Sequence, residues 1–321
     1  MVFDTAVSDM FDVPSGVPQG SHLGPSLFLL FINDLASVVE NSLIIKFADD
    51  VKICSHLGDT TLLQIDLDNI YIWCKRNLMS LNLNKCKHMA FSWRSCINSV
   101  FFIDGIPISR VETIKDLGVV FDPKLKFHLH IEHISHRASS MLGFVKRWGK
   151  EFRDPYITKL LYTSLVRSIL EYASVVWHPH YNIHIDLLES VQKQFLLFAL
   201  RHLFSGPMTD LPPYEARLKL IDLPTIQSRR ILMNVCFIFK LVTNEVESEV
   251  LLNKLCFNVP VRPSRHFQPL QLTYFTRNYL NFDPLRSACN DFNKYIDFSD
   301  FGSSLRILKQ KLALHLNNFL N

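Results

Sequence analysis

The chain has 321 residues, of which 48% are hydrophobic and 20% are charged, and its formal net charge is +4. This hydrophobic content is sufficient for a folded core and excludes an intrinsically disordered chain, and the length suits two or three domains. The longest apolar run, residues 27–32, is too short to span a bilayer, which takes about 20 residues.

The cysteines indicate a reducing compartment. There are seven, namely Cys54, Cys74, Cys86, Cys96, Cys236, Cys256 and Cys289. Their odd number and the absence of a C-x-x-C pair argue against a disulfide framework and against a zinc knuckle. Because Asp4 interrupts the start, we recognise no secretory signal. We therefore expect an intracellular protein, in the nucleus or the cytoplasm, that is not secreted and does not enter a membrane.

The first chemically suggestive stretch is the loop at residues 15–21, with the sequence SGVPQGS. Residues 1–14 before it predict short paired strands, and residues 22–40 after it predict an apolar helix. Two glycines allow a ligand to approach the backbone closely. Ser21 is placed to cap the helix, whose first N–H groups are free to bind an anion.

Residues 43–54 predict a β-hairpin with two adjacent carboxylates, Asp49 and Asp50, at its tip. Apolar, β-rich runs lie on both sides of the acidic pair. The alternative interpretation is purely structural, since Asp is a favourable turn residue whose side chain can bond its own backbone. Taken alone, the hairpin does not decide between these two interpretations.

The elements that follow are assigned from the period of their apolar residues. Residues 60–77 predict a helix with Leu63, Leu67, Ile70 and Cys74 on one stripe. Residues 81–91 predict a strand. Residues 101–107 predict a hairpin that turns at Asp-Gly.

From about residue 125 the period changes to that of helices. We expect helices over residues 130–150, 155–172, 214–246 and 303–320, with breaker-rich stretches at 205–213 and 260–269. The four histidines between positions 128 and 136 lack neighbouring ligands at metal-site spacing, so a wet helix face is the preferred interpretation there.

One segment carries the whole positive excess. Between positions 137 and 167 there are only two acids, and the basic residues are Arg137, Lys146, Arg147, Lys150, Arg153, Lys159 and Arg167. A basic stripe on helices is a candidate phosphate-binding face. A solvated helix surface is the alternative.

Three motifs, in this order and spacing, resemble the palm of reverse transcriptases of non-LTR (LINE-type, jockey-like) retrotransposons. They are the loop SGVPQGS, the apolar helix that ends in Ile32-Asn33-Asp34-Leu35, and Phe47-Ala48-Asp49-Asp50. The resemblance implies an α+β fold. It consists of a partial polymerase palm, with an antiparallel sheet and helices, over residues 1–122, an all-helical thumb over 123–204 and a C-terminal helical extension over 205–321.

The resemblance implies an RNA-directed DNA polymerase that joins a dNTP to a DNA primer on an RNA template, with Mg²⁺ (or Mn²⁺) as the cofactor. Asp49 and Asp50 would be the catalytic metal ligands, and Lys85 would lie near the triphosphate, with Lys87 as the alternative. The remaining roles it implies are nucleotide binding for Pro18, Gln19, Gly20 and Phe47, primer grip for Leu117 and Gly118, and nucleic-acid backbone contacts for Lys146, Arg147, Lys150 and Arg153.

The family has a third carboxylate on an earlier strand, followed by a helix. Asp4 cannot be this residue, because only ten residues separate it from Ser15. We therefore expect the C-terminal part of a polymerase, without its fingers or an endonuclease, and inactive alone. The alternative is a decayed or domesticated remnant that only binds nucleic acid, and the genomic sequence upstream of Met1 would discriminate the two.

Overall fold

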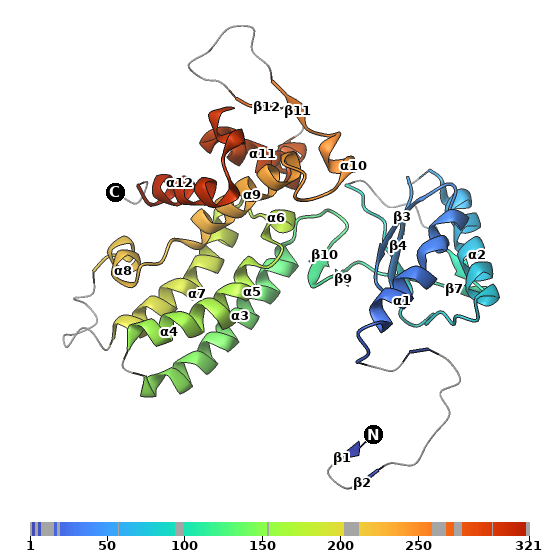
Figure 1. Ribbon diagram of the computed structural model, residues 1–321, viewed down its shortest axis with the longest axis horizontal. Helices are drawn as coiled ribbons and strands as arrows, with labels where there is room; N and C mark the ends of the chain where they lie inside the picture. The colour runs from blue at the N-terminus through green and yellow to red at the C-terminus, as the bar shows by residue number, and fades with distance from the viewer. Residues whose placement is uncertain are drawn as a thin grey trace. The chain divides into compact units, whose positions relative to one another are not determined.

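The computed structural model describes residues 2–3, 6–7, 16–17, 20–56, 58–93, 99–152, 154–201, 212–258, 268–272, 278–296 and 298–318. The chain divides into two compact units, Met1–Ile114 and Lys115–Asn321, which are treated separately below (Figure 1). Within the described ranges, no helix combines the length and the hydrophobicity needed to cross a membrane.

The first unit is α+β, as the sequence predicts. Its helices are α1 (Gly24–Phe31), the 3₁₀ helix η1 (Asn33–Val38) and α2 (Thr60–Arg76). Its strands are β1 (Val2–Phe3), β2 (Ala6–Val7), β3 (Leu43–Phe47), β4 (Asp50–Cys54), β5 (Lys87–His88), β6 (Phe102–Ile103), β7 (Ile106–Pro107) and β8 (Ser109–Arg110). They pair two by two, and only β5 with β8 is parallel.

The centre of this unit is the antiparallel hairpin β3–β4, which pairs from Leu43↔Cys54 to Phe47↔Asp50. One face of the hairpin packs on α1, η1 and α2, around a buried cluster of Ile32, Leu35, Ile70, Trp73 and Cys74. Ile44, Val51 and Ile53 are the residues that the hairpin contributes to this cluster. Burying side chains of this size stabilises the unit by about 1.5–3 kcal/mol each.

Two polar side chains fix the hairpin against the helices. Lys46 donates from Nζ to the carbonyls of Ile32 (3.2 Å) and Asn33 (2.9 Å), where α1 ends and its free carbonyls attract a cation. Asp66, fully buried on α2, accepts from the backbone N–H of Glu40 (3.1 Å) and Asn41 (3.2 Å). Burial alone would raise the pKa of Asp66, but the hydrogen bonds it accepts outweigh burial and lower that pKa.

The local predictions for this unit have mixed outcomes. Helix α2 and the hairpin β6–β7 are confirmed, the latter turning at Asp104 (φ 54°) and Gly105 (φ 72°). The strand predicted over residues 81–91 is wrong beyond β5. Residues 82–86 form turns instead, with Lys85 N–H bonded to the carbonyl of Asn82 at 3.0 Å. The helix predicted over 22–40 is interrupted at Ile32, where α1 gives way to η1.

The boundary between the units falls within β9 (Ile114–Asp116), which pairs with β10 (Val119–Phe121). The rest of the second unit is almost entirely helical. Its first helical part comprises α3 (His128–Trp148), η2 (Gly149–Glu151), α4 (Pro155–Leu161), the π-helix η3 (Tyr162–Arg167), α5 (Ser168–Glu171), α6 (Ser174–Trp177) and α7 (Asn182–Leu200). Its second part comprises α8 (Tyr214–Ile221), α9 (Ile226–Val242), α10 (Glu249–Leu252), β11 (Cys256–Phe257), β12 (Leu270–Gln271), η5 (Asn278–Phe282), α11 (Pro284–Tyr295), η6 (Phe298–Gly302) and α12 (Leu305–Asn318).

Two hydrophobic clusters stabilise the second unit, and α9 takes part in both (Figure 1). The first lies among α3, η3, α5, α7 and α8, with Ile226 at the start of α9. The second lies among α9, α11 and α12, and α9 contributes Val235, Ile238 and Phe239 to it. Helix α9 therefore packs against both clusters.

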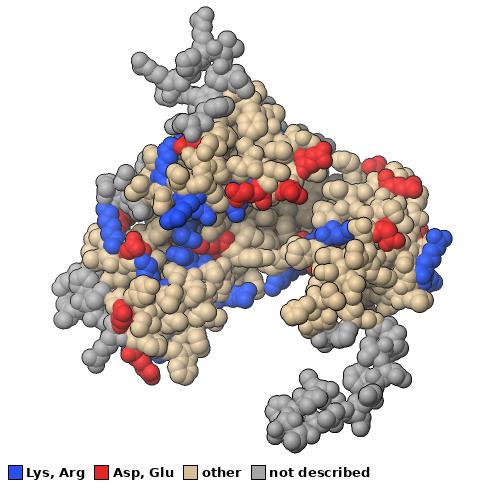
Figure 2. All heavy atoms as spheres, viewed as in Figure 1, with Lys and Arg blue, Asp and Glu red and all other residues tan. Residues whose placement is uncertain are grey.

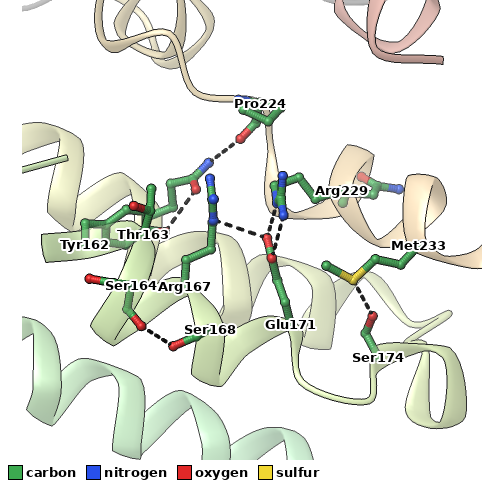
Figure 3. Close-up of polar contacts among 12 residues, drawn as sticks. Tyr162, Thr163, Ser164, Arg167, Ser168, Glu171, Ser174, Pro224, Arg229 and Met233 are labelled. Carbon is green, nitrogen blue, oxygen red and sulfur yellow. Dashed lines mark hydrogen bonds and ion pairs between the residues drawn. The ribbon is translucent and has the colours of Figure 1, made fainter. Parts of the chain in front are cut away.

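A buried polar network joins α5, η3 and α9 (Figure 3). The carboxylate of Glu171, which is 8% exposed, accepts from Nε and NH2 of Arg229, and Arg167 approaches it at 3.5 Å. Figure 3 shows the two guanidinium groups pointing at Glu171 from opposite sides. Burial lowers the pKa of Arg167, and the neighbouring charge of Arg229 lowers it further. Glu171 therefore offsets a repulsion between two cations held close together.

Candidate active site

The acidic pair lies where the sequence predicts, at the tip of the β3–β4 hairpin. Phe47 pairs with Asp50, which leaves Ala48 and Asp49 as the turn. Ala48 has a φ of 51°, a left-handed conformation that costs a residue with a Cβ about 1–2 kcal/mol. Strain of this kind is frequent at functional sites, where a tight turn presents particular side chains.

Both carboxylates are exposed, and no residue of the described ranges donates a hydrogen bond to either. Lys46, which precedes Phe47 on β3, points to the inner face and donates to the carbonyls at the end of α1. Phe47 is 60% exposed and lies with Leu43 and Ile45 on the outer face of the hairpin. The hairpin tip therefore presents two carboxylates, which can act as metal ligands, and one aromatic ring to solvent.

The loop before α1 is described at Gly16, Val17 and Gly20 onward, so the predicted nucleotide-binding residues Pro18 and Gln19 lie outside the described residues. Gly20 has a φ of 83°, which only glycine adopts without strain. The hydroxyl of Ser21 accepts from the N–H of Leu23 at 3.3 Å, just before α1 begins. The N-cap of α1 is Leu23, and no side chain caps the helix, so the predicted capping by Ser21 is wrong.

Lys85 is exposed in the turn of residues 82–86. Lys87, its alternative, lies on β5 and is also exposed. No group of three or more His, Cys, Asp or Glu residues with the geometry of a metal site occurs in the described ranges. The acidic pair fits Mg²⁺ as a partial ligand set, since protein sites for this ion usually supply one or two carboxylates and leave the rest to phosphates and water.

In the second unit, the predicted primer-grip residues Leu117 and Gly118 form the turn between β9 and β10. Their φ angles are 42° and 87°. The hydroxyl of Tyr172 donates to the carbonyl of Leu117 at 2.9 Å, and a Cβ on Gly118 would lie 3.1 Å from the Tyr172 ring. The positive φ of residue 118 favours glycine, and a Cβ there would also press on the Tyr172 ring.

Sequence reasoning missed the residues that hold this turn, because their partners are distant in the chain. Besides Tyr172, His130 accepts from the N–H of Val120 at 3.2 Å and packs edge-on against Trp177. Burial lowers the pKa of His130 to about 4, with a further contribution from His133 and Lys115. His130 is thus a neutral, structural histidine at physiological pH.

The predicted phosphate-binding residues differ in exposure. Arg147 and Lys150 are exposed, and Lys146 is half-buried, which lowers its pKa, whereas Arg153 lies outside the described residues. Two further cations of the same segment are already engaged, since Lys159 donates to Asp222 (2.7 Å to its carbonyl) and Arg167 contacts Glu171. On the face that Figure 2 shows, Lys and Arg side chains gather at the middle of the helical unit.

Residues 229 and 230 contribute little to the exposed basic surface. Arg229 is bound to Glu171, and Arg230 is fully buried, with no described residue accepting a hydrogen bond from its guanidinium. Burial lowers the pKa of Arg230 to about 10. Net charge alone therefore overstates the surface available for phosphate.

Residues 8–121 match the family described as Reverse transcriptase (RNA-dependent DNA polymerase). This range contains the acidic hairpin tip, Lys85 and the turn of residues 117–118. No solved structure gives a significant match.

Among relatives, a probable RNA-directed DNA polymerase from transposon X-element of Drosophila melanogaster is 26% identical over 60% of this chain and 22% of its own length. The RNA-directed DNA polymerases from the mobile element jockey are 28% identical in Drosophila funebris, over 57% of this chain and 22% of the relative, and 32% identical in Drosophila melanogaster, over 40% and 15%. The chain thus matches about a fifth of the length of these relatives.

Proposed function

The chain is a relative of the RNA-directed DNA polymerases of non-LTR retrotransposons, and from this premise we propose that it carries part of a polymerase palm and its nucleic-acid-binding thumb. The observation that carries the proposal is the hairpin tip, where a strained two-residue turn presents Asp49 and Asp50 to solvent. Residues 1–122 would be the palm portion, 123–204 the thumb and 205–321 a helical extension.

In this proposal Asp49 is the principal metal ligand and Asp50 the second. A divalent ion held there would supply positive charge next to the primer hydroxyl and the triphosphate. Pro18, Gln19, Gly20 and Phe47 would contact the incoming nucleotide, and Lys85 would approach its triphosphate. Leu117 and Gly118 would position the primer, held in place by Tyr172.

We propose that the 321-residue chain does not polymerise on its own, since it matches about a fifth of the length of the polymerases it resembles. It would then act together with the remainder of a longer polymerase. Its substrates would be an RNA template, a DNA primer and a dNTP.

Duplex binding by the basic segment should depend steeply on salt. The exposed and half-buried cations Arg137, Lys146, Arg147 and Lys150 can each release a counterion when they contact phosphate. With about 0.9 per contact on B-form DNA, the slope of log K against log salt is expected to lie at about −3 to −4. Fluorescence anisotropy of a labelled duplex at several salt concentrations measures it.

The matched variants come from the same segment. Reversing the charge of Lys146, Arg147 and Lys150 to Glu should remove about three phosphate contacts. The slope of log K against log salt should then become shallower by about 2.7. Lys159→Gln, at a cation already engaged by Asp222, should leave the slope unchanged. If the affinity for the duplex does not depend on salt, or if both variants change the slope equally, the segment is only a solvated surface.

A further inference from the structure

Helix α3 has two faces with different chemistry. One face is buried in the first hydrophobic cluster through Ile131, Ile134, Ala138, Leu142 and Val145, at the i, i+3, i+4 spacing of a helix. The other face lines a groove of about 470 Å³, formed by Arg137, Ser140, Met141, Phe144 and Arg147. Met141 of this lining also packs against the cluster, whereas Arg137, Phe144 and Arg147 are exposed.

Two aromatic rings stand on the grooved face. Phe144 is 44% exposed and Trp148, one turn further on, is 62% exposed. Their ring centroids lie 6.2 Å apart with the planes tilted by 50°. Large aromatic side chains that remain exposed next to each other mark a binding surface more often than single exposed residues do.

The charge around these rings has one sign. No acidic residue occurs in the sequence between Glu132 and Glu151. Arg137 and Arg147 line the groove at its two ends, ten residues or about 15 Å apart along the helix axis, and Lys150 is exposed just beyond. A surface that pairs exposed rings with flanking arginines complements a ligand with flat apolar faces and regularly spaced negative charges.

We propose that this groove binds an unpaired stretch of nucleic acid, with bases stacked on Phe144 and Trp148 and phosphates on Arg137 and Arg147. This inference rests on the proposed nucleic-acid function and adds the kind of strand that the α3 face prefers. Within a duplex the faces of the bases are covered by stacking on the neighbouring base pairs, so exposed rings offer their stacking only to single strands. A separation of about 15 Å suits roughly three to five nucleotides.

The test compares two strands on the whole 321-residue chain. The probes are a fluorescently labelled, unstructured 20-nucleotide single strand and a 20-base-pair duplex of the same sequence, followed by anisotropy. The double variant Phe144→Leu with Trp148→Leu keeps apolar side chains on an exposed helix face but removes the rings. It should weaken single-strand binding roughly 10- to 100-fold, the range expected for one or two stacked bases, and change duplex binding by less than about twofold.

Two further variants separate the contributions. Arg137→Gln with Arg147→Gln should weaken binding of both probes and make the salt slope shallower by about 1.8 for the duplex and about 1.4 for the single strand. Phe257→Leu, which removes an exposed aromatic on β11 of the same unit, should change neither affinity. Circular dichroism of each variant reports whether the helices are intact.

An aromatic double variant that binds both probes like the unmodified chain would overturn the inference and favour a protein segment as the occupant of the groove. Equal weakening for both probes would also overturn it, because stacking would then not distinguish the strands. Neither result contradicts the proposed polymerase function, provided that duplex binding still depends on salt. Loss of salt-dependent binding to every probe would instead contradict the proposed function itself.

Discussion

Asp49→Asn is expected to abolish primer extension when residues 16–121 of this chain replace the matching stretch of the jockey polymerase of Drosophila melanogaster. The substitution keeps the size of the side chain and its tolerance for the turn, but removes the negative charge that a divalent cation requires. We expect a loss of at least about a hundredfold, the effect of removing a single preorganised electrostatic contact in other active sites. Extension of a DNA primer on an RNA template with Mg²⁺ and dNTPs is the measurement.

The matched control is Asp59→Asn, because Asp59 is an exposed acid in the same unit, at the start of α2, where its side chain makes no capping hydrogen bond. It should keep full activity. The 321-residue chain by itself should show none. A chimera whose Asp49→Asn variant stays active, or which is inactive without any substitution, would contradict the assignment of the acidic hairpin.

Glu171→Ala is expected to destabilise the helical unit by about 3 kcal/mol, as judged by the urea midpoint of the helical signal. The change leaves Arg167 and Arg229 without their shared carboxylate, and loss of one partner of a buried ion pair costs about 3–5 kcal/mol. Both arginine side chains retain some exposure, at 18% and 25%, which moves the expectation to the lower end of this range.

The control for Glu171 is a surface ion pair on the same unit. Asp222, whose side chain is 98% exposed, pairs with Lys159 at 3.0 Å. Asp222→Asn preserves the left-handed conformation at the end of α8 and should cost less than about 1 kcal/mol. Equal effects at the two positions would show that the Glu171 network contributes no more than a solvent-screened pair.

The elements that the sequence predicts correctly are those specified by local signals. The β3–β4 hairpin, the Asp104-Gly105 turn and helix α2 each follow from period and turn chemistry within a few residues. The strand predicted over 81–91 failed because alternation of apolar residues is not sufficient for pairing. Only Lys87–His88 meets a partner, and the stretch before it closes into turns.

Long-range contacts explain what the sequence could not reveal. Asp66 looks like an ordinary polar residue of a helix, yet it is buried because its hydrogen-bond donors lie about 25 residues upstream. Lys159 and Arg167 count as free charges in the sequence, but the fold pairs them with acids from distant or buried positions. Tyr172 supports the turn at Leu117 across 55 residues, a relation that no local pattern encodes.

We propose that Asp49, Asp50 and the loop around Gln19 form one site for a metal ion and a nucleotide. Affinity cleavage tests this proposal. Fe²⁺ bound in place of Mg²⁺, with ascorbate and peroxide, generates hydroxyl radicals that cut only the backbone close to the ion. The 321-residue chain is used, with a dNTP present, and the fragments are mapped by mass spectrometry.

We predict cuts near residues 18–20 and near residues 48–51, both suppressed by excess Mg²⁺ and both lost in Asp49→Asn with Asp50→Asn. Cuts near the hairpin without any near residues 18–20, or cleavage that the double variant leaves unchanged, would contradict the claim.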